Sequence, residues 1–414
     1  MDLPLVAGWC CAVCGAHVDI ATPLAWRCPN AVGDDRHHAL ELVQAMAPLR
    51  STGDDNPFLG FRRYLAWDSY ASSLGLTEAA RDAIVRDLDA QVATVAGTGF
   101  HTTPFERADA LSDALGFTAD GGVWVKDETR NVAGSHKARH LFTILLHLVT
   151  TELAGRAPWS SPADRPPLAI ASCGNAAMAA STLAAAVQWP IRVFVPVSAN
   201  PVVVARLHEL RAHVITCPRL DTDPPRDPCV HRFPGTIGWE MARHMEERIE
   251  GPPFDRLFVQ VGGGAFAACL AAGFRMSGIT PRLHAVQTQS CAPLERAWQR
   301  SFDVGGPKAA AAHWSECMWP WEHVGESAAD GILDDETYDW LPVLRAMADG
   351  HGSPVVASEA QVLEANDLLV RHTGIDASPT GTAGLAGVLA VRDPLDPTRR
   401  GAVGASGLRP RARR

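Results

Sequence analysis

Segment 126–140 contains a lysine that could act as a nucleophile. The segment reads Lys-Asp-Glu-Thr-Arg-Asn-Val-Ala-Gly-Ser-His-Lys-Ala-Arg-His. The second lysine of the segment, Lys137, follows a Gly-Ser turn and lies at the N-terminus of an expected helix rich in alanine and leucine. An amine held there can be partly desolvated, which favours the neutral form that attacks a carbonyl to give a Schiff base. Lys137 is therefore the first candidate for catalysis.

A glycine loop, Val261-Gly-Gly-Gly-Ala265, lies between an expected strand and an expected helix. Its backbone N–H groups can converge on an anion at the positive end of the helix. Gly262, Gly264 and Ala267 also satisfy the dinucleotide pattern Gly-x-Gly-x-x-Ala, which needs an acidic residue at the end of the next strand. That strand ends in Gln-Thr-Gln without an acid, which favours phosphate. A tight packing turn is the alternative without a ligand.

A second turn, Ala171-Ser-Cys-Gly-Asn-Ala-Ala177, again joins an expected strand to a helix. Gly174 permits a sharp bend, and Ser172 and Asn175 can present donors to a carboxylate or phenolate oxygen. Taken alone, the motif favours ordinary N-capping of the helix by Asn175.

A third turn, Asp376-Ala-Ser-Pro-Thr-Gly-Thr-Ala-Gly384, is rich in hydroxyls and opens a helix of small residues. Thr380, and with less weight Ser378, can place a neutral hydroxyl against a heteroaromatic nitrogen. Helix capping is again the alternative.

In their order along the chain, the four segments resemble the fold type II pyridoxal-phosphate enzymes. These include threonine synthase, threonine and serine dehydratases, cysteine synthase and the tryptophan synthase β subunit. The resemblance covers roughly residues 98–390, is closest to threonine synthase-like members, and includes the opening motif His101-Thr-Thr-Pro104. It implies that Lys137 is the catalytic Schiff-base lysine and that Ser172, Cys173 and Gly174 bind the substrate. It also implies that pyridoxal 5'-phosphate is bound by Lys137, Asn175, Gly262, Gly263, Gly264, Ala265 and Thr380.

The resemblance further implies a lyase that acts on a small amino acid by β- or γ-elimination or replacement. Thr380 would leave the pyridine nitrogen unprotonated, which suits elimination over transamination, and Lys137 would take the Cα proton. Threonine synthase-like and serine/threonine dehydratase-like activities are the first expectation, and diaminopropionate or hydroxyaspartate ammonia-lyase is the alternative. A threonine synthase would also need basic residues for a substrate phosphate, for which Lys126, Arg130, Arg139 and Arg206 are candidates.

Three other interpretations carry less weight. The tryptophan synthase β subunit has Gln-His and an upstream catalytic Glu at the second turn, and this chain has neither. A catalytically inert binding protein of the same fold would be expected to lose the lysine or the glycine loop, and both are kept. A nicotinamide oxidoreductase would leave Lys137 without a role.

The N-terminal cysteines form a separate pattern. Cys11-x2-Cys14, Cys28 and His38 resemble a zinc ribbon or knuckle, with Cys10 and His37 as other choices for the fourth ligand. Bound structural zinc and a degenerate ribbon without metal are both open. The remaining cysteines are scattered, as expected for buried thiols in a reducing compartment.

Alternating strands and helices must position these residues. Near-continuous apolar strands indicate parallel sheets in an α/β fold. The pattern predicts helices at 77–96, 137–152, 176–187 and 266–276, and strands at 123–126, 168–172, 191–197, 257–261 and 283–287.

With the resemblance, we expect two parallel-sheet subdomains with the cofactor in the cleft between them, plus a small cysteine-rich N-terminal segment. The predicted boundaries are 1–60 for the cysteine-rich segment, 61–130 with 235–395 for the large cofactor-binding domain, 131–234 for the small domain, and 396–414 for a disordered tail.

Composition narrows the class. The 414 residues carry a formal net charge of −9, which argues against a nucleic-acid surface. No apolar run approaches the roughly 20 residues that span a bilayer, and the N-terminus lacks the features of a secretory signal. We expect a cytoplasmic homodimer that binds a small amino acid and neither nucleic acid nor membrane.

Overall fold

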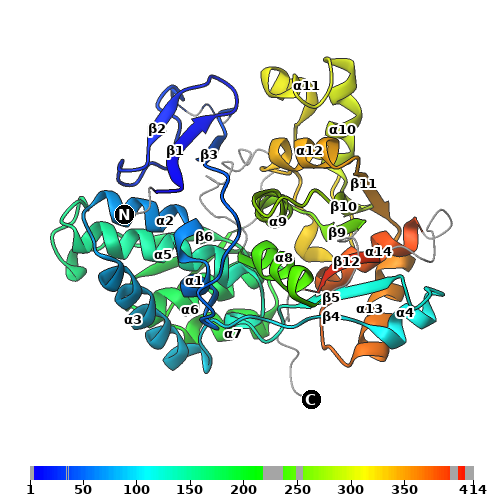
Figure 1. The fold of residues 1–414 in the computed structure, drawn as a ribbon, viewed down its shortest axis with the longest axis horizontal. Coiled ribbons are helices and arrows are strands. Elements are labelled where there is room, and N and C mark those ends of the chain that lie inside the picture. The colour runs from blue at the N-terminus through cyan, green and yellow to red at the C-terminus, as the bar shows by residue number, and fades with distance from the viewer. Residues whose placement is uncertain are drawn as a thin grey trace.

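The computed structural model describes residues 4–33, 35, 37–217, 236–248, 255–391 and 400–405. Within them the strands form three sheets (Figure 1). None of the described helices is both long and apolar enough to cross a membrane.

The first sheet is a small antiparallel one, called here the N-terminal sheet, with the order β2-β1-β3. Its buried side shares a core with Ala66 and Tyr70. Its strands are β1 (Val6–Cys11), β2 (His17–Asp19) and β3 (Leu40–Gln44).

The second sheet, β6-β7-β8, is parallel and forms the small lobe together with the helices that cover it. Thr77 caps one of these helices by accepting a hydrogen bond from the backbone of Ala80, and Gly97 ends the same helix in the left-handed region. The strands are β6 (Leu168–Ala171), β7 (Ile191–Pro196) and β8 (His213–Cys217), and the helices are α1 (Pro57–Gly60), α2 (Ala66–Ser73), α3 (Glu78–Ala96), α5 (Lys137–Leu153), α6 (Asn175–Ala186) and α7 (Pro201–Glu209).

The third sheet belongs to the large lobe and has the order β11-β10-β9-β12-β5-β4. All neighbouring strands are parallel except β4, which pairs antiparallel with β5. These strands are β4 (Phe105–Arg107), β5 (Gly122–Asp127), β9 (Arg256–Gln260), β10 (Arg282–Thr288), β11 (Ser353–Ala357) and β12 (Arg400–Ala405).

Helices cover both faces of the large sheet, because its central strands are apolar on both sides. One face packs against α8 (Thr236–Arg248), α9 (Ala265–Met276), α10 (Pro293–Asp303), α11 (Trp314–Cys317) and α12 (Trp340–Asp349). The other packs against α4 (Asp109–Ala114), α13 (Glu359–Thr373) and α14 (Pro379–Ala390).

The architecture confirms the expected α/β fold with two parallel-dominated sheets and an N-terminal cysteine-bearing segment. Two details differ from the sequence interpretation. Helices α2 and α3 share the core of the small lobe, whereas the sequence interpretation assigns 61–130 as a whole to the large domain. Residues 400–405, placed in a disordered tail, form β12 between β9 and β5, because pairing on both edges compensates for weak apolar character. Residues 406–414 lie outside the described residues.

Candidate functional site

Lys137 is the first residue of α5, on the small lobe. The turn before it contains Ala133 and Gly134, both with positive φ, and Ser135 is fully buried. Lys137 itself is half-buried. Among the described residues, none forms a hydrogen bond or ion pair with its amine, so the side chain is available to a ligand.

Asp339 is a buried carboxyl whose pKa responds to the charge of Lys137. It precedes α12 and is 3% exposed. Burial raises the pKa of its carboxyl well above the usual range, and the charge of Lys137 partly opposes this rise. Its backbone N–H donates to Gly263 O at 2.9 Å. Asp339 is therefore hydrogen-bonded to the glycine loop of the large lobe and lies within electrostatic range of Lys137 of the small lobe.

The glycine loop lies where β9 ends and α9 begins. Gly264 is the N-cap of α9 with φ 93°, and no side chain caps the helix there. A Cβ at Gly262, Gly263 or Gly264 would lie 2.5–2.9 Å from side-chain atoms of Asp334, Tyr338 or Thr337, respectively. The loop must therefore be glycine to fit under segment 334–339. Its N-terminal N–H groups form the type of end that binds anions.

His136 shows that this region can accept a polar ligand. Its ring stacks on Phe266, in the first turn of α9, with centroids 4.1 Å apart. Both ring nitrogens are buried without a hydrogen-bond partner among the described residues. Burial, followed by the charge of Lys137, lowers the pKa of His136 well below its usual value, so the ring is neutral. Since buried polar atoms are normally satisfied, a polar group such as the expected cofactor fits this place.

Thr380 lies in the first turn of α14 and contacts the same segment of the large lobe. Its Oγ1 accepts a hydrogen bond of 3.0 Å from Gly331 N. Because a hydroxyl also carries a donor, Thr380 can still donate to a ring nitrogen. Ser378, the other hydroxyl considered, is the N-cap of α14 and accepts from Gly381 N at 3.2 Å. Capping thus describes Ser378, while Thr380 remains the candidate.

The second turn is not capped as the motif alone suggested. α6 begins at Asn175, its N-cap is Gly174, and no side chain caps it. Ser172 Oγ accepts from Gly174 N at 3.3 Å. Cys173 packs against the small-lobe core, and all four residues of the turn are half-buried. The half-buried Asn175 amide and the uncapped N–H groups are available to a ligand, as the resemblance implies.

Two of the basic residues proposed for a substrate phosphate have a different role. Lys126 and Arg139 are 1% and 4% exposed and pair with the equally buried Glu128 and Glu240. Lys126 Nζ lies 2.5 Å from Glu240 Oε2, and Arg139 Nε lies 2.8 Å from Glu128 Oε2. Neither cation can reach a substrate.

The four buried charges, called here the buried quartet, also hold the motif His101-Thr-Thr-Pro104. Thr103 donates its hydroxyl to Glu128, and its carbonyl accepts from Lys126 Nζ at 2.7 Å. Of the other two basic candidates, Arg206 pairs with Glu209 on an exposed face, and Arg130 is exposed.

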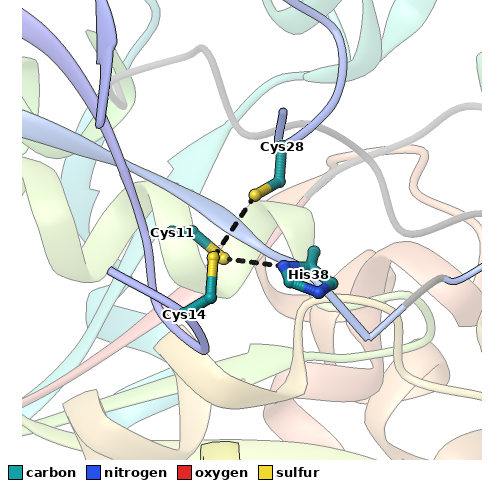
Figure 2. A group of neighbouring side chains, drawn as sticks. All are labelled: Cys11, Cys14, Cys28 and His38. Carbon is teal, nitrogen blue, oxygen red and sulfur yellow. Dashed lines mark hydrogen bonds between the residues drawn. The ribbon is translucent and has the colours of Figure 1, made fainter. Parts of the chain in front are cut away.

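The N-terminal cysteines converge, as Figure 2 shows. One ligand atom from each of Cys11, Cys14, Cys28 and His38 lies within 4.8 Å of all the others. The closest pairs are Cys11 Sγ with His38 Nδ1 at 3.3 Å and Cys14 Sγ with Cys28 Sγ at 3.5 Å. We call this group the Cys3His cluster. Its donor set is one that zinc prefers.

Segment 330–339 was missed by the sequence reasoning. It supplies Asp339 next to Lys137, the side chains that cover the glycine loop, and the N–H that meets Thr380. The only local signal was a run of acidic residues, Asp334-Asp-Glu-Thr-Tyr-Asp339, directly before an apolar helix.

Comparison with known families places the chain in one of them. The sequence pattern of the family described as pyridoxal-phosphate dependent enzyme matches residues 97–232 and 227–407. No curated protein matches the chain.

Among solved structures, similar folds include a threonine deaminase from T.th., with 23% identity and a TM-score of 0.58 over 78% of this chain and 97% of that chain. Processed threonine deaminase isoform 2 of Solanum lycopersicum has 17% identity and a TM-score of 0.55, over 80% of this chain and 90% of that chain. Serine racemase of Dictyostelium discoideum has 16% identity and a TM-score of 0.54, over 78% of this chain and 97% of that chain. At these identities the likeness concerns the fold.

Proposed function

The chain belongs to the pyridoxal-phosphate-dependent enzyme family, and on that premise we propose that it is a lyase that removes the β-hydroxyl of a small amino acid such as serine or threonine. The observation that carries the proposal is the junction of the two lobes around Lys137. There Asp339 donates its backbone N–H to the glycine loop within electrostatic range of Lys137, and the neighbouring His136 stacks on the first turn of α9.

The cofactor would be held by residues of both lobes. Lys137 would bind it covalently through Nζ, the N–H groups at Gly262–Ala265 would receive its phosphate, and Asn175 would contact the ring oxygen. When bound, pyridoxal phosphate supplies the electron sink that makes the Cα proton of an amino acid acidic. Ser172, Cys173 and Gly174 would hold the substrate carboxylate.

Thr380 supports elimination over transamination. A threonine hydroxyl is neutral and can only share its proton with a ring nitrogen, whereas an aspartate in this position would favour a protonated nitrogen. The hydrogen bond from Gly331 N fixes Thr380 Oγ1 and leaves its proton free to be donated.

The proton transfers fall to Lys137 and Asp339. In its neutral form, Lys137 Nζ accepts the proton from the substrate Cα. The Asp339 carboxyl, whose pKa burial raises, can exchange a proton with that amine.

The buried quartet shifts the proposal away from threonine synthase-like chemistry and toward a dehydratase. Lys126 and Arg139 form buried ion pairs, so two of the four basic residues considered for a substrate phosphate cannot bind it. The names of the similar structures, namely threonine deaminases and a serine racemase, are consistent with a substrate without phosphate.

We also infer that the Cys3His cluster binds structural zinc. In a tetrahedral site with Zn–S of about 2.3 Å, sulfurs lie about 3.8 Å apart, and sulfur and nitrogen about 3.6 Å. The pairs at 3.5 and 3.3 Å are close to these values. His38 Nε2 lies 3.3 Å from Asp35 Oδ2, the second contact that metal-bound histidines usually make. Four protein ligands leave no open position, so the role is structural.

The proposal is tested by cofactor loading and a substrate screen. Purified wild type should be yellow with lysine-bound cofactor, and Lys137→Ala should lose that absorption band. The screen measures keto acid, ammonia and phosphate released from serine, threonine, phosphohomoserine, 2,3-diaminopropionate and hydroxyaspartate. Phosphate release from phosphohomoserine alone would overturn the dehydratase proposal, and a colourless wild type loaded with cofactor would overturn the family mechanism for this chain.

A further inference from the structure

The ligand loops of the Cys3His cluster lie against two different lobes. On the small-lobe side, the loop that leads to Cys28 contacts α5. Leu24 N donates to His147 Nε2 at 3.3 Å, and the Trp26 ring meets the edge of the His147 ring with centroids 5.8 Å apart. Thus the Cys28 ligand is attached to the helix that begins at Lys137.

The chain around the other three ligands also contacts the large lobe, although Cys11 itself lies in the core that the N-terminal sheet shares with α2. Ala12 and Val13, which lie between Cys11 and Cys14, pack against the core of the large lobe. His37, next to His38, stacks on Trp314 of α11 with centroids 5.5 Å apart and an angle of 13° between the planes. Figure 1 shows the N-terminal sheet above α2 and α5, with α11 and α12 across from it.

An ion pair extends this second attachment to α12. Glu41 of β3 accepts two hydrogen bonds from Arg345 Nη1, at 2.8 and 2.9 Å, and both side chains are partly buried. Arg345 lies on α12, whose N-cap is Asp339. The N-terminal segment therefore touches the two helices at whose N-terminal ends Lys137 and Asp339 lie.

We propose that the metal-bound Cys3His cluster is a clasp that fixes the spacing of α5 and α12, and with it the distance from Lys137 to Asp339 and the glycine loop. The clasp rests on the zinc site proposed above. One tetrahedral ion joins the loop docked on the small lobe to the loops docked on the large lobe. The contact with α5 at His147 lies roughly 15 Å along the helix from Lys137, and the contact with α12 at Arg345 lies roughly 9 Å from Asp339. Helices transmit such a constraint as rigid bodies.

A purely local role for the metal predicts something different. If zinc only folds the N-terminal sheet, its loss would loosen residues 6–44 and leave α12 and segment 330–339 as they are. Because these two segments are distant from the cluster in sequence and in another lobe, their behaviour separates the two ideas.

The first experiment compares amide hydrogen exchange in holoenzyme before and after zinc is removed by chelation, and again after zinc alone is added back. Metal content and the visible absorption of the cofactor are measured on the same samples. We expect one zinc per chain, an increase of about tenfold in exchange over α12 and 330–339 when it leaves, and reversal on re-addition. Cys28→Ser should behave like the chelated protein. Cys10→Ser, which removes a cysteine next to Cys11 but outside the Cys3His cluster, is the control and should retain its zinc and its exchange pattern.

The second experiment removes the ion pair between the N-terminal sheet and α12 and leaves the metal ligands unchanged. Arg345→Ala should keep its zinc, yet exchange over 330–339 should rise about twofold to fivefold, as expected for the loss of one partly exposed ion pair. Arg371→Ala, which removes an exposed ion pair with Asp367 on α13, is the matched control and should leave that segment unchanged.

The outcomes are distinguishable. Wild type without metal would overturn the zinc site and the clasp together. Zinc loss that leaves exchange over α12 and 330–339 within twofold would overturn the clasp alone. A protein that never takes up cofactor would overturn the proposed reaction, while the metal and exchange results would still decide the clasp.

Discussion

Replacing Glu240 by glutamine removes one of the two carboxylates that neutralise Lys126 and Arg139 inside the protein. In wild type the buried quartet has two positive and two negative charges, each at most 5% exposed. Glu240→Gln leaves a net buried charge of one positive unit, and Lys126→Met leaves one negative unit. The double variant is neutral again, because Arg139 keeps its two hydrogen bonds to Glu128 at 2.8 and 3.0 Å.

The expected size follows from the cost of an uncompensated buried charge, which is about 3–5 kcal/mol. Each single variant should lose this much free energy of unfolding. At about 2–4 °C per kcal/mol, the midpoint of thermal unfolding should fall by roughly 6–20 °C. The double variant should be more stable than either single variant, with a coupling free energy of at least about 3 kcal/mol.

Calorimetry of the four proteins at one pH and with equal cofactor loading measures these values. Ser112→Ala and Ser301→Ala, buried polar changes away from the quartet, serve as controls for simple loss of a polar group. Two results would refute the reasoning: single variants within about 1 kcal/mol of wild type, which is about a third of the smallest expected loss, or a double variant whose loss equals the sum of the two.

Four further predictions concern the site and its surroundings. Thr380→Asp should favour a protonated pyridine and raise the ratio of transamination to elimination, and an unchanged product ratio would count against Thr380 as the nitrogen partner. Asn175→Ala should shift the absorption of the bound cofactor while some cofactor is retained; an identical spectrum would remove Asn175 from the ring oxygen. Asp339→Asn should keep the bound cofactor but lower kcat by about 10²–10⁴-fold and change its pH profile, whereas a purely structural Asp339 would leave the shape of that profile intact. His284, whose pKa is lowered to about 4 by burial and then by the charge of Arg256, should cost stability in acid. The unfolded chain takes up a proton as pH falls through about 6.5 while the folded protein does not until about 4, so the free energy of unfolding should drop by about 3 kcal/mol over this window. Urea unfolding at pH 7 and pH 4 should show that His284→Gln loses correspondingly less.

Local patterns were sufficient for most elements near the site. The helix expected at 137–152 is α5, the strand at 257–261 is β9 shifted by one residue, and the helix at 266–276 is α9. These follow from apolar periodicity and from turn residues within a few positions of each element boundary. The three candidate ligand-binding turns were identified in the same way, because glycine and hydroxyl residues at strand-to-helix junctions are local features.

Features that depend on distant partners were not predictable. Lys126 and Arg139 look like surface cations in the sequence, and only their contacts with Glu240, about a hundred positions away, bury them. The same holds for Asp339, since nothing near it in the sequence indicates that Lys137 is its neighbour in space. The weakly apolar β12 is a strand because β5 and β9 supply hydrogen bonds on both sides.

The position of β12 also determines the order in which the protein can fold during its synthesis. The sheet and covering helices of the small lobe all precede the end of β8, with β4, α4 and β5 of the large lobe inserted between them, so the small lobe can fold as soon as β8 leaves the ribosome. The large sheet has its last-made strand in the middle, and until residues 400–405 emerge, the facing edges of β5 and β9 have no partner between them. At typical translation rates, the interval between the synthesis of β9 and that of β12 lasts roughly 7–30 s. During that time the nascent large lobe exposes the unpaired edges of two apolar strands. We expect chaperones that bind extended apolar segments to remain bound to these strands until β12 is made.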